Sequence, residues 1–178
     1  GAWGIIVPMV NSAAEARAVV EAARYAPIGN RSVGGQLHAV NFNTDPATYY
    51  QTANEEIFVA VMAEHVLASE ALDEIAAVPG IDAFFVGPND LLQSYGLKPG
   101  FDSDDPRFNA ALRKVVTVAR KHGIAPGIHV ADAAMARKRI DEGFQFIAVA
   151  SEVGMMLAKA QEIAKSLSLS GGAAIARY

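Results

Sequence analysis

The stretch IDAFFVGPNDLLQSYG, residues 81–96, joins an apolar segment to a short polar turn. Its uninterrupted apolar residues, which end at Val86, predict a strand that is buried on both faces of a parallel sheet. Gly87 lets a ligand approach the backbone, and Pro88 makes the turn rigid. The stretch therefore predicts a buried strand that delivers one carboxylate, Asp90, to the start of a short helix.

The same strand-then-helix unit is repeated along the chain. Five apolar segments predict strands at residues 3–10, 57–63, 81–86, 124–130 and 144–150. Between and after them, periodic segments predict helices at residues 12–25, 45–56, 68–78, 105–122, 132–142 and 152–167. This repetition predicts a parallel α/β sheet, either doubly wound and open or part of a (β/α)8 TIM barrel. A complete barrel takes about 250 residues, so five units are too few for one.

The bulk composition narrows the class of protein. The chain has 178 residues, 52% apolar and 19% charged, which is typical of a globular domain. A net charge of −4 without basic clusters argues against a nucleic-acid partner, and no apolar run is long enough for a membrane helix. The absence of cysteine excludes disulfides, thiolate metal sites and a cysteine nucleophile, and it fits a cytoplasmic protein.

The two ends of the sequence lead to two further expectations. The chain has no initiator Met and opens almost directly on a strand, so we expect it to be a fragment. We expect residues 1–167 to form the barrel-like domain and residues 168–178 to be a loosely ordered tail. Residues 26–45 are predicted to form a long loop, which is usually functional or disordered at this length.

Two carboxylates follow neighbouring predicted strands. Glu64 comes directly after the second strand, and Asp90 comes after the third. Adjacent parallel strands lie about 4.8 Å apart, so these side chains can converge at the carboxyl edge of the sheet, where α/β proteins bind ligands. Oxygen ligands suit Mg²⁺ or Mn²⁺. The alternative is that both are acids that cap or begin helices.

Other strand-end groups also have two interpretations. The free N–H groups of Asn89 and Asp90 could hold a carboxylate, or they could belong to an ordinary strand-to-helix turn. His65 and His129 could be metal ligands or a base, or they could be hydrogen-bonded structural residues. No lysine ends a predicted strand, which argues against a Schiff-base aldolase. The pattern also suggests a group of methionines that fill the core: Met9, Met62, Met155 and Met156.

Three longer segments of the sequence are distinctive: GIIVPMVNSAAEARAVVEAARYAPIGNRSVGG, VMAEHVLASEALDEIAAVPGIDAFFVGPNDL and APGIHVADAAMARKRIDEGFQFIAVASEVGMML. They resemble the HpcH/HpaI aldolase family of metal-dependent pyruvate aldolases. The similarity extends from about Gly1 to Leu167. Its most specific part is the order of three features: the V-P-M-V segment, a strand-end glutamate at Glu64, and a G-P-x-D-L segment that contains Asp90.

The resemblance implies a (β/α)8 barrel, of which this chain would supply strands four to eight. It implies that Glu64 and Asp90 bind a divalent cation (Mg²⁺, Mn²⁺ or Co²⁺), and that Gly87 to Asp90 hold the pyruvate carboxylate through the backbone N–H of Asn89. The implied reaction is the cleavage of 4-hydroxy-2-oxo acids to pyruvate and an aldehyde through a metal-stabilised enolate. The implied assembly is a homo-oligomer, typically a hexamer, in which the last helix packs on a neighbouring subunit.

The sequence departs from the family pattern at several positions. Met62 stands where the family usually has a substrate-contacting Gln, and Asn89-Asp90-Leu91-Leu92 replaces the usual Ala-Asp-Leu-Ser. The family's catalytic His and Arg belong to the first three βα units, outside this chain, so that role is assigned to none of the four histidines: His38, His65, His122 and His129. Two alternatives stay open: a non-catalytic partial barrel for ligand binding or oligomer contacts, and a related lyase or synthase acting on acyl-CoA esters or oxaloacetate.

Overall fold

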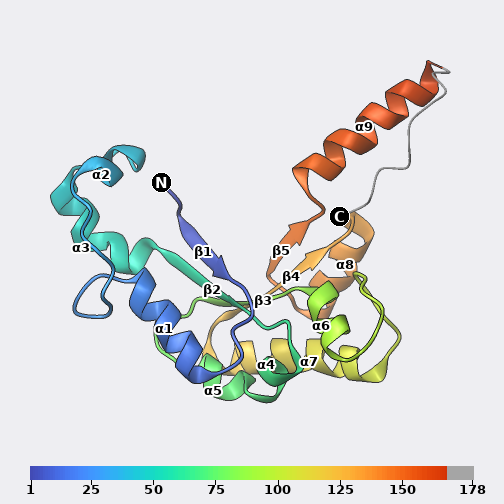
Figure 1. The fold of residues 1–178 in the computed structure, drawn as a ribbon, viewed down its shortest axis with the longest axis horizontal. Helices are drawn as coiled ribbons and strands as arrows, with labels where there is room; N and C mark the ends of the chain where they lie inside the picture. Colours follow the sequence, from blue (N-terminus) through green and yellow to red (C-terminus); the bar gives the residue numbers. More distant parts are fainter. Residues whose placement is uncertain (168–178) are drawn as a thin grey trace.

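The computed structural model describes residues 1–167, and within them five parallel strands form one sheet (Figure 1). The strands are β1 (Gly4–Val7), β2 (Phe58–Met62), β3 (Ala83–Val86), β4 (Ala125–Val130) and β5 (Phe146–Val149). Each strand pairs with the next one along the chain, in the order β1-β2-β3-β4-β5. A doubly wound sheet reverses its strand order at a switch point, so this order excludes it and agrees with the barrel prediction.

The described helices lie between successive strands, except α9, which follows β5, and they mostly agree with the predicted ones. They are α1 (Ala13–Ala23), α2 (Leu37–Asn41), α3 (Pro46–Glu56), α4 (Val66–Glu70), α5 (Leu72–Ala76), α6 (Pro88–Ser94), α7 (Pro106–His122), α8 (Ala133–Glu142) and α9 (Glu152–Ser166). Two predictions were wrong in detail. The helix predicted over 68–78 is divided into α4 and α5, and the loop predicted over 26–45 contains α2. The predicted loose tail, 168–178, lies outside the described residues.

Local capping explains why the helix boundaries could be predicted. The carboxylates of Asp105 and Asp132 accept hydrogen bonds from backbone N–H groups in the first turns of α7 and α8. Both helices end at a glycine in the left-handed conformation, Gly123 and Gly143. These caps depend on neighbouring residues alone, so a sequence pattern is sufficient to predict them.

Alternate residues of the strands face two different environments. One face packs against the helices and forms the main core, with Val61, Phe84, Val86 and Ile128 fully or almost fully buried. Figure 1 shows α1, α4, α5 and α7 on this side of the sheet, while the other side is open. We call the open side the inner face.

Aromatic rings on the inner face show that the sheet is curled. The rings of Phe58 on β2 and Phe146 on β5 meet with their centroids 5.2 Å apart, and Phe85 on β3 contacts the same Phe146 ring at 5.4 Å. In a flat sheet, β2 and β5 would be separated by three strand spacings, about 14 Å. The inner face must therefore be strongly concave, as part of a barrel wall is.

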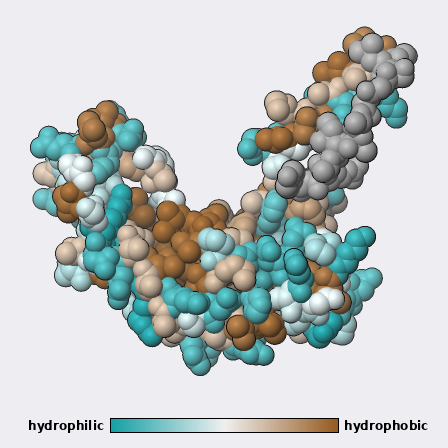
Figure 2. All heavy atoms as spheres, viewed as in Figure 1, coloured by the Kyte–Doolittle hydropathy of each residue, from teal (hydrophilic) through white to brown (hydrophobic). Residues whose placement is uncertain are grey.

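The edge strands are less buried than predicted. Strand β1 was expected to be buried on both faces, but Ile5 and Ile6, which point to opposite faces, are 38% and 44% exposed. The reason is position: β1 pairs only with β2, and the described helices pack mainly against the central strands. Figure 2 shows hydrophobic surface in the hollow that lies between the α3 side of the molecule and α9.

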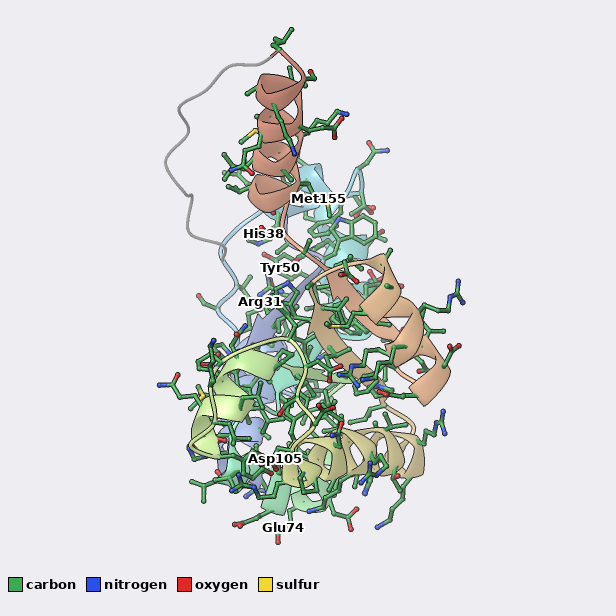
Figure 3. All side chains as sticks on the ribbon, turned by 90° about the vertical axis from the view of Figure 1, so that its right-hand side faces the viewer. Arg31, His38, Tyr50, Glu74, Asp105 and Met155 are labelled. Atoms are coloured by element: carbon green, nitrogen blue, oxygen red, sulfur yellow. The ribbon has the colours of Figure 1, made fainter. Side chains whose placement is uncertain are left out.

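The segment 26–45 is ordered by an aromatic cluster. The Arg31 guanidinium lies 4.7 Å from the centre of the Tyr25 ring and donates to the Tyr49 hydroxyl, and His38 Nε2 lies 2.8 Å from the Tyr50 hydroxyl. Arg31, His38 and Tyr50 are labelled in Figure 3. Burial raises the pKa of Tyr25 to about 12. Polar residues that looked like an open loop in the sequence are therefore packed against α3.

Candidate functional site

Glu64 is the best-buried carboxylate at the carboxyl edge of the sheet. It lies two residues beyond β2 and is only 2% exposed. Its Oε1 accepts a hydrogen bond from the backbone N–H of Met9, at 2.9 Å, just beyond β1. Met9 has a positive φ of 56°, which is uncommon for a residue with a side chain. This local strain lies at the position where the backbone holds the buried carboxylate.

Gly87 provides the space that the Glu64 carboxylate occupies. A Cβ atom at this position would lie 2.2 Å from Glu64 Oε2 and 3.1 Å from Met62 Cε. The backbone φ of Gly87 is −92°, so the glycine is required by the lack of space and not by its backbone angle. The structure therefore brings together three residues that the sequence singled out, from the ends of β2 and β3.

Asp90 lies close enough to Glu64 for its negative charge to affect the pKa of the Glu64 carboxyl. Burial raises the pKa of the Glu64 carboxyl above its usual value, the Met9 hydrogen bond lowers it, and the negative charge of Asp90 raises it further. Asp90 itself is exposed, in the first turn of α6. The two carboxylates are thus close enough for their charges to interact, and their repulsion is not relieved by an ion pair among the described residues.

The turn between β3 and α6 exposes backbone donors. Pro88 occupies the first helical position and is buried, while Asn89 is half-buried. Within the described chain, no protein acceptor bonds the N–H groups of Asn89 and Asp90. These groups lie beside the carboxylate pair, so they are available to an anionic ligand.

The four histidines fall into two groups. His65 caps α4, because its Nδ1 accepts from the N–H of Leu67, and this matches the structural alternative. His38 belongs to the aromatic cluster, and His122 binds Asp73 at the far end of α7. Only His129 lies on the inner face of the sheet, at the end of β4.

The methionines were mostly misjudged from sequence. Met9, Met155 and Met156 are between 46% and 64% exposed, so they do not fill the core. Of these four methionines, only Met62 is partly buried, and its Cε lies 3.1 Å from where a Cβ atom on Gly87 would be. The role of the Met9 backbone was also missed, since an N–H contact and a positive φ leave no signature in residue type. The V-P-M-V segment was the available signal, but its meaning came only from the resemblance.

The donor set suits a hard divalent cation. Two carboxylates converge, one of them buried with a raised pKa, and a positive charge between them would relieve both the repulsion and the burial. Among the described residues, no group of three or more His, Asp or Glu side chains comes together. A cation held here would therefore keep coordination positions for water and for a chelating ligand.

The strand order, the curled sheet and the strand-end carboxylates together define part of a βα barrel with a ligand site at its carboxyl edge. The family model described as HpcH/HpaI aldolase/citrate lyase matches residues 1–159. The chain belongs to this family, as the sequence resemblance predicted.

Individual relatives agree with the family assignment. A hydroxypyruvate/pyruvate aldolase of Pseudomonas aeruginosa is 36% identical over 92% of this chain and 60% of its own length. A 4-hydroxy-2-oxo-heptane-1,7-dioate aldolase of Shigella flexneri is 34% identical over 99% of the chain and 66% of its own length. The crystal structure of a family protein from Burkholderia cenocepacia J2315 superposes with a TM-score of 0.83 at 30% identity, covering 94% of this chain and 66% of that one. The chain thus spans about three fifths of the length of the first of these relatives.

Proposed function

We propose that the protein containing this chain is a divalent-metal-dependent aldolase that cleaves 4-hydroxy-2-oxo acids to pyruvate and an aldehyde. The observation that supports the proposal is the buried Glu64 carboxylate at the carboxyl edge of the sheet, within the influence of the Asp90 charge and packed over Gly87, which has no side chain. Two relatives bear aldolase names, for hydroxypyruvate/pyruvate and for 4-hydroxy-2-oxo-heptane-1,7-dioate, and these names support the same reaction class.

Each residue of the site has a proposed task. Glu64 and Asp90 hold the cation, which supplies Lewis-acid polarisation of the keto oxygen of a 2-oxo acid. The Met9 N–H fixes one oxygen of Glu64, so that the other faces the space above Gly87. The N–H groups of Asn89 and Asp90, on the turn made by Gly87 and Pro88, bind the carboxylate of the 2-oxo acid.

Met62 would contact the substrate from the inner face. It is the inner-face residue of β2 that lies nearest to Gly87. A thioether offers dispersion contacts and only a weak acceptor, so this side chain would favour an apolar part of the substrate. The catalytic His and Arg of the family remain assigned to units outside this chain.

The test is a kinetic comparison in the full-length protein that contains this chain. Pyruvate release from 4-hydroxy-2-oxoheptanedioate is measured with Mn²⁺, with Mg²⁺, with Co²⁺ and after EDTA treatment. Wild-type protein should be active only with a metal, and Glu64→Gln and Asp90→Asn should each lower kcat/KM at least a hundredfold. Glu70→Gln, which changes an exposed glutamate on α4, is the matched control and should keep full activity. Normal activity of both site variants would contradict the proposal.

We also propose that the protein is a homo-oligomer, hexameric as in the family, in which α9 packs on a neighbouring subunit. No residue of α9 is buried within this chain, and the helix projects away from the sheet (Figures 1 and 3, with Met155 labelled). Its apolar side chains recur at helical spacing at Val153, Met156 and Ile163, all at least half exposed. Such a stripe is typical of an interaction surface. In sedimentation experiments, Met156→Glu should yield smaller species, whereas Lys165→Glu, on the opposite face of the same helix, should not.

The cytoplasmic location stays a prediction. Among the described residues, no helix has both the length and the apolar content needed to cross a membrane.

A further inference from the structure

His129 is the one histidine of the described chain that faces the concave side of the sheet. It is paired with Ala148 of β5, and its neighbours Ile128 and Val130 point to the opposite side, into the core. The inner-face residues that precede it on β4 and β5 are Gly127 and Phe146. The imidazole therefore stands at the same edge of the sheet as Glu64, where the proposed substrate binds.

The position of His129 relative to the site follows from the strand register. Val86 of β3 is paired with Ile128 of β4, so the next residues, Gly87 and His129, follow side by side at the ends of adjacent strands. Adjacent strands lie about 4.8 Å apart. The Glu64 carboxylate occupies the space above Gly87, so a ligand held by this carboxylate lies at the strand end next to that of His129.

A single hydrogen bond fixes the proton on the imidazole. Nε2 of His129 lies 3.0 Å from the carbonyl oxygen of Ala150, and a carbonyl can only accept, so Nε2 carries the hydrogen. In the neutral ring, Nδ1 is then an acceptor, and no described residue bonds it. Ala150 has a positive φ of 54°, uncommon for alanine, and this strained backbone carries the carbonyl that His129 bonds.

A second contact holds the plane of the ring. Phe101, in the loop between α6 and α7, packs edge-on against the imidazole, with centroids 5.1 Å apart and planes at 85°. The next residue, Asp102, binds Lys138 and the fully buried Arg139, each at 2.6 Å. The loop is thus tied to α8, so the imidazole is held on one edge by a carbonyl and on its side by a fixed aromatic ring.

We propose that His129 is a specificity-determining residue whose Nδ1 accepts a hydrogen bond from a hydroxyl group of the substrate. A preorganised acceptor favours a hydroxyl donor over an analogue that lacks one. The inference rests on the proposed aldolase function. The hydroxyl can belong to the 2-oxo acid, as in hydroxypyruvate, or to the aldehyde, as in glycolaldehyde.

The experiment measures kcat/KM for aldol addition by the full-length protein with Mn²⁺. One arm compares hydroxypyruvate with pyruvate, each with acetaldehyde, and the other compares glycolaldehyde with acetaldehyde, each with pyruvate. Wild-type protein should prefer the hydroxylated compound in one arm, and that arm identifies the source of the hydroxyl. His129→Leu, which removes both ring nitrogens, should reduce this preference about tenfold while changing kcat/KM for the non-hydroxylated partner less than twofold.

Two further variants separate recognition from structure. His129→Asn places an amide oxygen near the position of Nδ1 and should restore most of the preference, although it loses the bond to Ala150. His65→Asn keeps the helix cap of α4 and should leave both arms unchanged. If His129→Leu lowers kcat/KM equally for the hydroxylated and the non-hydroxylated compound, or for neither, the inference is wrong although the aldolase proposal stands. If the wild type shows no metal-dependent aldol chemistry, the proposed function is wrong and the inference with it.

Discussion

The central strands and the edge strands of this sheet have similar sequences and very different environments. β3 reads AFFV and is buried at every position, whereas β1 reads GIIV and is partly exposed at every position. Both segments are apolar and short, so periodicity predicts the same buried strand for each. The difference comes from what lies beside them, because β3 is paired on both sides and β1 on one. The residues of a segment thus determine that it forms a strand, whereas the burial of that strand depends on the strands beside it.

The largest expected effect tests this comparison directly. Phe84→Ala empties a fully buried position in β3 and should reduce the free energy of unfolding by about 3–5 kcal/mol. Ile5→Ala in β1 removes a side chain that is already 38% exposed and should cost about 1 kcal/mol. Urea denaturation of both variants measures the two losses. Equal losses would show that β1 is as well buried in solution as β3.

A smaller effect is expected at Gly87, where the buried strand β3 ends at the candidate site. Gly87→Ala pushes a Cβ against the Glu64 carboxylate and should destabilise the fold by about 1–3 kcal/mol. Gly100→Ala is the matched control: its Cβ would lie 3.6 Å from the nearest atom, so its effect should stay within about 0.5 kcal/mol. Thermal unfolding in EDTA compares the two. A harmless Gly87→Ala would mean that the carboxylate does not occupy the space seen here.

Much of the architecture could be predicted from sequence because its signals are local. The N-caps Asp105 and Asp132 and the C-terminal Gly123 and Gly143 each act through bonds within a few residues, and α7 and α8 begin and end as predicted. The aromatic cluster that orders 26–45 could not be predicted in this way. It depends on Arg31 and His38 meeting Tyr25, which follows α1, and the tyrosines of α3, which only the folded chain brings together.

The candidate site likewise contains residues that the sequence could predict and contacts that it could not. Glu64 and Asp90 could be selected because strand-end carboxylates on successive strands converge in any parallel sheet. The sequence could not predict three other features of the site: the backbone N–H of Met9, the space at Gly87 and the carbonyl of Ala150. Each of them acts through a backbone conformation or through the absence of a side chain.

The smallest expected effect concerns the charge on the buried carboxylate of Glu64. The pKa of Glu64 is raised by burial, so the folded state holds its proton more tightly than the unfolded chain. The contribution of Glu64 to the free energy of unfolding is therefore fully present below its pKa in the unfolded chain. It decreases as the pH rises through its pKa in the folded state. In EDTA, Glu64→Gln should raise Tm at pH 7 and make little difference near pH 4, as pH-dependent melting curves would reveal. A variant that melts below wild type at pH 7 would contradict the pKa shift.

The central claim is that Glu64 and Asp90 together hold a divalent cation, and diffraction tests it most directly. Crystals of the full-length protein grown with Mn²⁺ and oxalate, a stable mimic of a 2-oxo acid enolate, are measured at the manganese edge. The account predicts one anomalous peak within about 2.0–2.4 Å of an oxygen of each carboxylate, with oxalate directed to the backbone N–H groups of Asn89 and Asp90. A peak elsewhere, or no peak between these two carboxylates, would contradict it.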